Sequence, residues 1–103
     1  MTTENEMTIK VIVELHAKPG RGTELRDLLE CVVAEYGLGQ PGFHGSTCYE
    51  VLDNPDIVVE IADWESAEVR ATVMQQAMND GAYAPLEDLL AAPFRATVIK
   101  QLP

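Results

Sequence analysis

Basic residues are scarce in this chain of 103 residues, which holds seven lysines and arginines against seventeen aspartates and glutamates. The net charge of −10 argues against sequence-independent binding of nucleic acid, because such binding needs clustered lysine and arginine to displace counterions. An acidic surface also disfavours anionic membranes. Neither kind of partner is therefore expected.

Long apolar runs are missing as well. No stretch approaches the ~20 apolar residues that a helix needs to span a bilayer. The N-terminus lacks the basic segment followed by an apolar segment that marks a secretory signal. Residues 1–8 are polar and acidic, and we expect them to form a flexible segment before a single domain over residues 9–103. These features predict a soluble, cytoplasmic protein.

Motifs for metals, nucleotides and covalent catalysis are also scarce. Cys31 and Cys48 form no metal-binding pair by spacing, and we expect each to be a small buried apolar residue. The segment Gly20-Arg21-Gly22-Thr23 precedes a helix, but it matches neither the P-loop pattern nor the GxGxxG pattern. No serine-histidine-aspartate arrangement stands out. We therefore expect neither a metal nor a cofactor.

The residues that are present alternate in a way that predicts strands and helices. Residues 9–17 alternate between apolar and mixed positions, as in a strand with one dry face. After a turn at 18–22, Thr23 is placed to cap a helix with a one-sided apolar stripe. That stripe consists of Leu25, Leu28, Leu29, Val32, Val33 and Tyr36.

The second half of the chain repeats this alternation. A strand over 43–52, a turn at 53–56 and a third strand leading to Trp64 read as a hairpin. A helix over 66–79, a short helix from Pro85 and a last strand over 94–101 follow. The order β-α-β-β-α-β predicts an α+β, ferredoxin-like fold with a four-stranded antiparallel sheet and its helices on one face.

The third strand ends in the most informative residues of the chain. Alternation places Glu60 and Trp64 on the same side of this strand, and Ser66 supplies a helix cap directly after it. Trp64, the only tryptophan, either fills core volume or lines a pocket at the strand end. Glu60 is either a base whose pKa is raised by burial or a salt-bridge partner.

The side of the sheet away from the helices needs a cover, because it is expected to mix polar and apolar groups. A second copy packed sheet to sheet would cover it and enclose a cavity, which predicts a homodimer. The side chains expected on this side are Glu14, His16, Tyr49 or Cys48, Glu60 and Trp64.

Four short segments, in this order and spacing, resemble the antibiotic biosynthesis monooxygenase family of dimeric α/β-barrel proteins over roughly residues 9–102. The segments are Lys18-Pro19-Gly20, Pro41-Gly42, Trp64-Glu65-Ser66 and the helix at 85–90. The resemblance implies a homodimer with a pocket between sheet and helices in each subunit. It also implies a phenolic substrate that, once deprotonated, passes an electron to molecular oxygen without flavin, metal or haem.

On this sequence the resemblance suggests a set of site residues. As catalytic residues it suggests Glu60, Trp64 and Tyr49, and as substrate-binding residues Trp64, Tyr83, His16 and Met74. Glu60 replaces an asparagine that some members carry four residues before the tryptophan. The family often has a histidine where this chain has Thr72 and Val73, and its absence counts against the haem-degrading branch.

Three functions remain open from the sequence. The first is a cofactor-independent monooxygenase acting on a small aromatic, polyketide-like or quinone substrate. The second is a non-catalytic dimer that binds a small ligand or organises a pathway. The third is an aromatic polyketide cyclase on a related dimeric barrel, which needs only shape and a proton shuttle.

Overall fold

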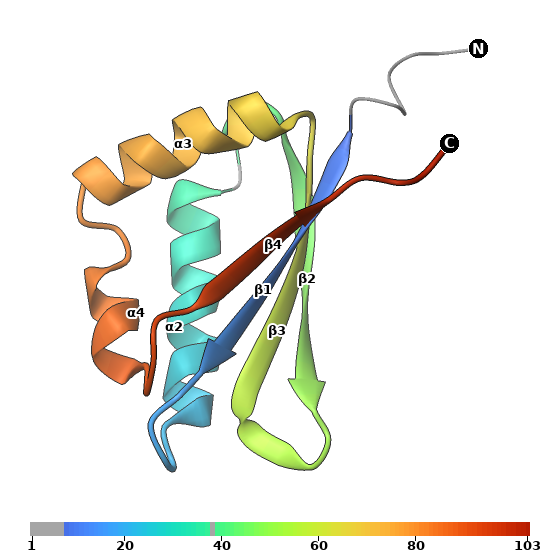
Figure 1. The fold of residues 1–103 in the computed structure, drawn as a ribbon. Coiled ribbons are helices and arrows are strands. Elements are labelled where there is room, and N and C mark those ends of the chain that lie inside the picture. Colours follow the sequence, from blue (N-terminus) through green and yellow to red (C-terminus); the bar gives the residue numbers. More distant parts are fainter. Residues whose placement is uncertain (1–7, 38) are drawn as a thin grey trace.

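The computed structural model describes residues 8–37 and 39–103. The segment expected to be flexible, residues 1–8, lies outside the described residues except for Thr8. The elements are β1 (Ile9–His16), α2 (Gly22–Tyr36), β2 (Phe43–Val51), β3 (Asn54–Trp64), α3 (Ala67–Asn79), α4 (Ala84–Leu89) and β4 (Arg95–Ile99). The predicted ferredoxin-like α+β order is confirmed (Figure 1).

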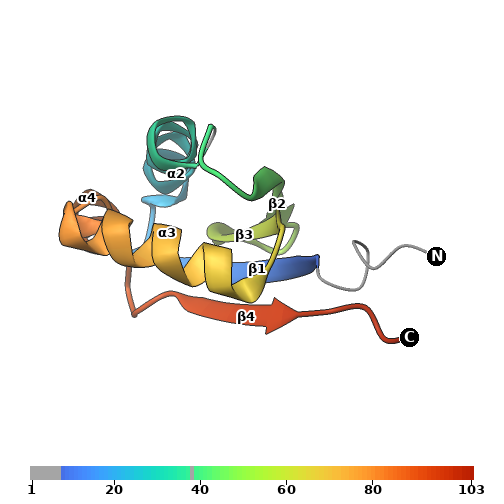
Figure 2. The same ribbon diagram turned by 90° about the horizontal axis from the view of Figure 1, so that it is seen from above.

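The four strands form one antiparallel sheet in the order β2-β3-β1-β4. All three helices lie on the same side of this sheet in both views (Figures 1 and 2). Since antiparallel sheets are commonly packed on one side only, this arrangement gives the sheet a covered face and an open face. The site described below lies on the covered face.

Strand register assigns residues to the two faces. Val13 of β1 lies opposite Glu60 of β3, which lies opposite Cys48 of β2. The covered face therefore carries Ile9, Val11, Val13, Leu15, Cys48, Val58, Glu60, Ala62 and Trp64. The open face carries Ile12, Glu14, His16, Tyr49, Ile57, Val59 and Ile61.

This register corrects the expected location of Glu60 and Trp64. The sequence-based expectation placed them with Glu14 and His16 on the side away from the helices, but they point toward the helices. Successive side chains of a strand alternate between faces, so the buried Val58 and Ala62 bring Glu60 and Trp64 to the same side.

The hairpin turn is tighter than predicted. Val51 pairs with Asn54, so the turn consists of Leu52 and Asp53 alone, and β3 begins before its proline. The Asn54 side chain accepts a hydrogen bond from the backbone N–H of Asp56 at 3.1 Å. Proline is tolerated near a strand end, where its missing donor breaks no central ladder bond.

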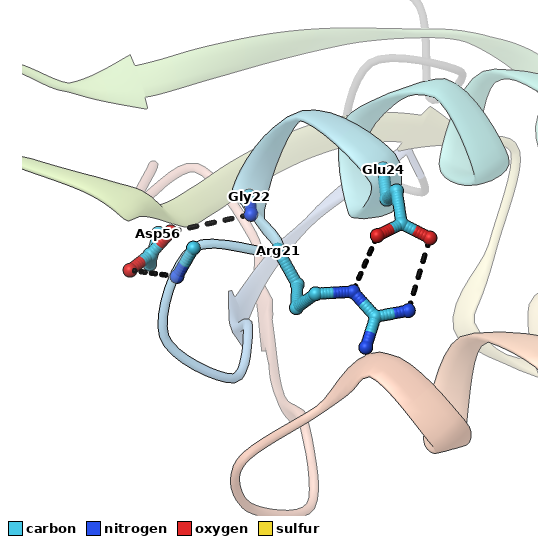
Figure 3. A network of polar contacts seen from close by, with 5 residues as sticks. Arg21, Gly22, Glu24 and Asp56 are labelled. Carbon is cyan, nitrogen blue, oxygen red and sulfur yellow. Dashed lines mark hydrogen bonds and ion pairs between the residues drawn. The ribbon is translucent and has the colours of Figure 1, made fainter.

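Helix α2 begins without the predicted Thr23 cap. Its first residue is Gly22, and no side chain of the preceding Arg21 caps it. The Asp56 carboxylate, which comes from the start of β3, instead accepts hydrogen bonds from Gly20 N at 3.1 Å and Gly22 N at 3.2 Å (Figure 3). A carboxylate at a helix start satisfies unpaired N–H groups and complements the helix dipole.

A charged pair lies beside this start. The Arg21 guanidinium donates to both carboxylate oxygens of Glu24 in the first turn of α2 (Figure 3). This hydrogen bonding lowers the pKa of Glu24 and raises the pKa of Arg21. Both side chains are exposed, so we expect the pair to add little stability.

Two apolar clusters form the core between sheet and helices. One joins β1 and β3 to α2 and α4 through Leu15, Ala17, Leu25, Leu29, Val58, Leu86, Leu89 and Leu90. The other surrounds Trp64 with Ile9, Val11 and Ala62, against Phe43 and helix α3. No helix of the described residues has the length and apolar character to cross a membrane.

The cysteines differ from expectation, because both Cys31 and Cys48 are exposed. Cys48 lies on the edge strand β2. Partial burial, followed by the charges of Glu60 and Glu30, raises the pKa of its thiol. Neither cysteine belongs to either core cluster.

Candidate active site

An apolar cavity of about 80 Å³ lies between the covered face and the three helices. Strands β1 and β3 form its floor, and α2, α3, α4 and the residues beside them form its walls. Its lining consists of Val11, Val13, Leu15, Leu29, Val32, Val33, Gly37, Phe43, Glu60, Ala62, Trp64, Arg70, Met74, Tyr83, Leu86 and Phe94. Only Glu60, Arg70 and Tyr83 in this lining carry ionisable side chains.

Aromatic rings form two parts of the cavity wall. Trp64 is 3% exposed and meets Phe43 edge to face, with ring centroids 5.0 Å apart and an interplanar angle of 62°. Tyr83 and Phe94 make a second, tilted pair at 6.0 Å. Such pairs hold flat apolar surfaces in fixed orientations, which suits a ring-shaped ligand.

The backbone around Trp64 fixes its position at the end of β3. The Ser66 hydroxyl accepts a hydrogen bond from Val69 N at 3.1 Å, so the predicted cap of α3 is confirmed. Glu65 N donates to Gly42 O at 2.7 Å. Gly42 has a φ of 82°, and a Cβ there would lie 2.4 Å from Val69 Cγ1. Glycine thus lets the turn before β2 touch the start of α3.

Among the residues that the structure describes, Glu60 is the only one that brings a carboxyl group to the cavity lining. Burial raises its pKa above the ordinary glutamate value, and this effect outweighs the opposing effects of the Ser46 hydroxyl and the Arg70 charge. Glu60 is not fully buried and forms no ion pair within the described part of the chain. A carboxyl group whose pKa is raised in this way exchanges its proton at a higher pH than an ordinary glutamate, which suits a general base.

Tyr83 lies between α3 and α4, where its hydroxyl donates to Met74 Sδ at 3.1 Å. Burial, followed by the negative charge of Glu60, raises the pKa of Tyr83, while Arg70 lowers it. Tyr83 therefore stays neutral at physiological pH and acts as a hydrogen-bond donor. The thioether it contacts is flexible and readily displaced.

The structure brings together four of the six site residues suggested from the sequence. Glu60, Trp64, Tyr83 and Met74 line one cavity. The other two, Tyr49 and His16, lie on the open face and away from that cavity.

Tyr49 is 51% exposed and pairs in register with Val59. His16 Nε2 lies 2.8 Å from the Glu14 carboxylate, and both side chains are exposed. Alternation explains the separation. His16 pairs with Ile57 and Tyr49 with Val59, and the side chains of Ile57 and Val59 point to the face opposite that of Glu60 and Trp64. Neither side chain reaches the cavity of its own chain.

Sequence reasoning missed Arg70, Phe43 and Phe94 as lining residues. Arg70 had a readable signal, because Val73, Met74 and Ala77 follow it at i+3, i+4 and i+7 on one side of α3. The helical spacing placed a charged residue on the buried side of this helix. The two phenylalanines had no such signal, since each lies at the edge of a loop.

The part of the chain that the structure describes holds no group of three histidine, cysteine, aspartate or glutamate side chains arranged for a metal ion. The glycine-rich turn before α2 offers little to a phosphate. Its Gly20 and Gly22 amides already donate to Asp56, whose negative charge would repel a second anion.

The sequence pattern of the antibiotic biosynthesis monooxygenase family matches residues 8–78, and the chain belongs to this family. The matched range contains both strands of the cavity floor, β1 and β3, and includes Glu60, Trp64, Arg70 and Met74. No protein of curated function matches the chain significantly.

Solved structures share the fold at low sequence identity. A conserved protein from Methanosarcina mazei matches with a TM-score of 0.83 and 17% identity, covering 99% of this chain and 100% of its own. SnoaB from Streptomyces nogalater, a cofactor-independent oxygenase whose mutant form was solved, matches at 0.78 and 17%, covering 91% and 92%. Rv0793 from Mycobacterium tuberculosis matches at 0.77 and 21%, covering 93% and 96%.

Proposed function

We propose that the protein is a cofactor-independent monooxygenase that oxidises a small phenolic or quinone-like aromatic compound with molecular oxygen. The observation that carries the proposal is a carboxyl group of raised pKa, Glu60, in an apolar cavity beside Trp64. Family membership and the fold shared with SnoaB, a cofactor-independent oxygenase, support it. Two copies pairing through their open faces would complete the assembly.

The proposed reaction converts a ring methylene flanked by phenolic groups to a carbonyl. In the hydroxyl tautomer of this substrate, where one methylene hydrogen has moved to a ring oxygen, Glu60 removes the O–H proton, and the electron pair of the broken bond stays on the substrate as a delocalised phenolate anion. The anion passes one electron to oxygen, and the radical and superoxide combine into a carbon-bound peroxide. The peroxide takes up the proton held by Glu60 and then loses water. One oxygen atom remains in the carbonyl and the other leaves in water with both methylene hydrogens.

The protein contributes positioning and desolvation in this scheme. Trp64 and Phe43 offer aromatic surface for the ring, and the apolar lining excludes water from the reactive anion. The cavity of about 80 Å³ is smaller than the roughly 150 Å³ of an engineered cavity that admits benzene. A substrate ring must therefore displace a mobile side chain, and Met74 is the most adaptable one in the lining.

The decisive test is oxygen uptake by the purified protein with a panel of hydroquinones, phenols and anthrones. We expect Glu60→Gln to lower kcat/KM by about 10²- to 10⁴-fold, the usual contribution of a general base. The matched control is Glu50→Gln, which removes an exposed carboxylate of β2 and is expected to leave kcat/KM unchanged.

The pH dependence follows from the raised pKa of Glu60. The base must be ionised, so kcat/KM of the wild type should rise with pH through a pKa above the ordinary glutamate value. Glu60→Gln should lose this rise. The monooxygenase proposal is wrong if the wild type consumes no oxygen with any member of the panel and none of them quenches the fluorescence of Trp64.

A cyclase remains the second candidate, because Glu60 and Tyr83 together offer a base and a hydrogen-bond donor in one cavity. The two reactions differ in their need for oxygen. Product formation from a polyketide-like substrate under nitrogen would favour cyclisation, whereas product formation only in air would favour oxygenation.

A further inference from the structure

Arg70 is the only basic side chain in the lining of the cavity. It projects from α3, is partly buried, and comes from the helix side opposite Glu60 on β3. Among residues 8–37 and 39–103, its guanidinium forms no hydrogen bond or ion pair. By contrast, Arg21 and Arg26 both contact carboxylates at the surface.

The charge of Arg70 nevertheless acts on the cavity. It opposes the effect of burial on the pKa of both Glu60 and Tyr83. Arg70 and Glu60 are thus close enough to interact through space but are not in contact. Partly buried charges that lack a direct partner are costly, and a group placed between them recovers hydrogen bonds for both.

We infer that Arg70 holds the oxygen of a ring-hydroxylated aromatic ligand that binds in the cavity as its phenolate, with the ligand's proton resting on Glu60. The inference deepens the proposed function and rests on it for the identity of the substrate class. It assigns the anion to a particular side chain, which makes Arg70 a specificity-determining residue.

The proton balance favours this arrangement. The ligand O–H bond breaks, its proton forms a neutral acid on a Glu60 carboxylate oxygen, and the electron pair stays on the phenolate oxygen. The negative charge thus moves from Glu60 to the ligand, and the net charge of the cavity stays the same. The cavity holds one cation and one anion before and after the transfer, and the bound phenolate gives Arg70 the direct partner that it lacks in the free protein.

A ring carboxylate fits the same cavity less well. It would bring a second permanent anion beside ionised Glu60, with Arg70 as the only cation to balance both. Repulsion between the two carboxylates would then oppose binding. A phenol avoids this because it enters neutral and ionises only by passing its proton to Glu60.

The test uses 4-nitrophenol, whose neutral and ionised forms have different absorption spectra. Titrating the bound probe by absorbance measures its pKa without any oxygen chemistry. In the wild type we expect the bound probe to have a lower pKa than in water. Arg70→Gln should raise the pKa of the bound probe by about one unit, a tenfold loss of phenolate. Arg70→Lys should recover part of the effect, because it keeps the charge but not the planar fork.

Two controls isolate the charge of Arg70 from general damage. Arg95→Gln removes an exposed arginine of β4, opposite Glu14 in register on the open face, and should leave the pKa of the bound probe unchanged. 4-Nitroanisole has a similar shape but no ionisable hydroxyl, and its affinity should be the same in wild type and Arg70→Gln. A circular dichroism spectrum checks that each variant is folded.

The outcomes separate this inference from the proposed function. An unchanged probe pKa in Arg70→Gln, or no binding of 4-nitrophenol to the wild type, overturns the assignment of Arg70, and oxygen uptake that depends on Glu60 would still support the monooxygenase. A shifted probe pKa without oxygen uptake keeps the phenolate site and removes the monooxygenase. Tighter, Arg70-dependent binding of 4-nitrobenzoate than of 4-nitrophenol overturns the phenolate in favour of a carboxylate site.

Discussion

The covered and open faces of the sheet are built from alternate residues of the same strands, yet they differ in kind. On the covered face, Leu15 and Val58 are each 2% exposed beneath the helices. On the open face their neighbours His16 and Val59 remain partly or fully accessible. One face makes a core with a cavity inside it, whereas the other carries apolar side chains that no helix among residues 8–37 and 39–103 covers.

This difference separates two aspects of the protein. Residues of a single chain suffice to line the cavity, among them Glu60, Arg70 and Trp64. The proposed homodimer would use the open face, where Ile12, Ile57, Val59 and Ile61 mix with charged residues. We therefore expect the proposed chemistry and the proposed assembly to be alterable independently, with different defects in variants of the two faces.

The largest effect on stability is expected from shortening a buried side chain of the covered face. Leu15→Ala should lower the free energy of unfolding by about 2–5 kcal/mol, because it leaves a cavity in a close-packed core. Urea denaturation followed by circular dichroism measures this. The adjacent His16→Ala should cost less than about 1 kcal/mol, since it removes only an exposed hydrogen-bonded contact with Glu14. Equal losses for the two variants would contradict the difference between faces.

The open face is tested through the oligomeric state. We expect the wild type to scatter light as a particle of twice the chain mass at micromolar concentration. Ile61→Glu should give a monomer, because it places a charge in the middle of the surface proposed to pair.

Leu52→Glu is the matched control. It makes a similar change at a residue that is 91% exposed at the hairpin tip, and the protein should stay dimeric. A wild-type monomer under these conditions would disprove the homodimer.

A smaller effect is expected at the start of α2, a helix on the covered face whose first N–H groups are bound by Asp56 of β3. Asp56→Ala should lower the free energy of unfolding by about 1–2 kcal/mol, the range for loss of a helix cap. Asp56→Asn should lose less, because its carbonyl oxygen still accepts one of the two hydrogen bonds. Thermal denaturation of both variants checks this order, and Thr23→Ala, which removes no cap, serves as the control.

The smallest effect concerns the carboxyl group of the covered face. Since burial raises the pKa of Glu60 in the folded state, its contribution to stability is complete below the ordinary glutamate pKa and is lost as pH rises through the raised value. The stability of the wild type should therefore fall slightly more over this range than that of Glu60→Gln. Urea midpoints at several pH values measure the difference. Parallel curves for the two proteins would mean that the folded-state pKa is not raised.

Much of the fold could be predicted because it depends on local patterns. Alternation at 9–15 and 57–64 and the helical stripe from Leu25 defined the strands and α2 within a few residues. The family resemblance, stated from four short segments, is confirmed by the match over residues 8–78. Ser66 could be predicted as a cap because the contact is local. Its hydroxyl accepts from the N–H of Val69, only three residues further along the chain.

The predictions that were wrong concern features that depend on contacts between segments distant in the sequence. The cap of α2 comes from Asp56, more than thirty residues away, so no local signal favoured it over Thr23. Alternation correctly put Glu60 and Trp64 on one side of β3, but it does not say which side the helices cover. Tyr49 was grouped with them for the same reason. Arg70 was not considered as a site residue, although Val73, Met74 and Ala77 follow it on the same side of α3.

The two hydrogen bonds of Asp56 also bear on the order in which the chain folds. Helix α2 has no cap of its own from the preceding residue, so its first turn gains its acceptor only when the hairpin reaches it. Short helices are marginal in isolation, and contacts between distant residues form late because closing the loop costs entropy. The start of α2 should consequently become ordered together with β3 rather than before it. Asp56→Ala would then speed unfolding more than it slows folding.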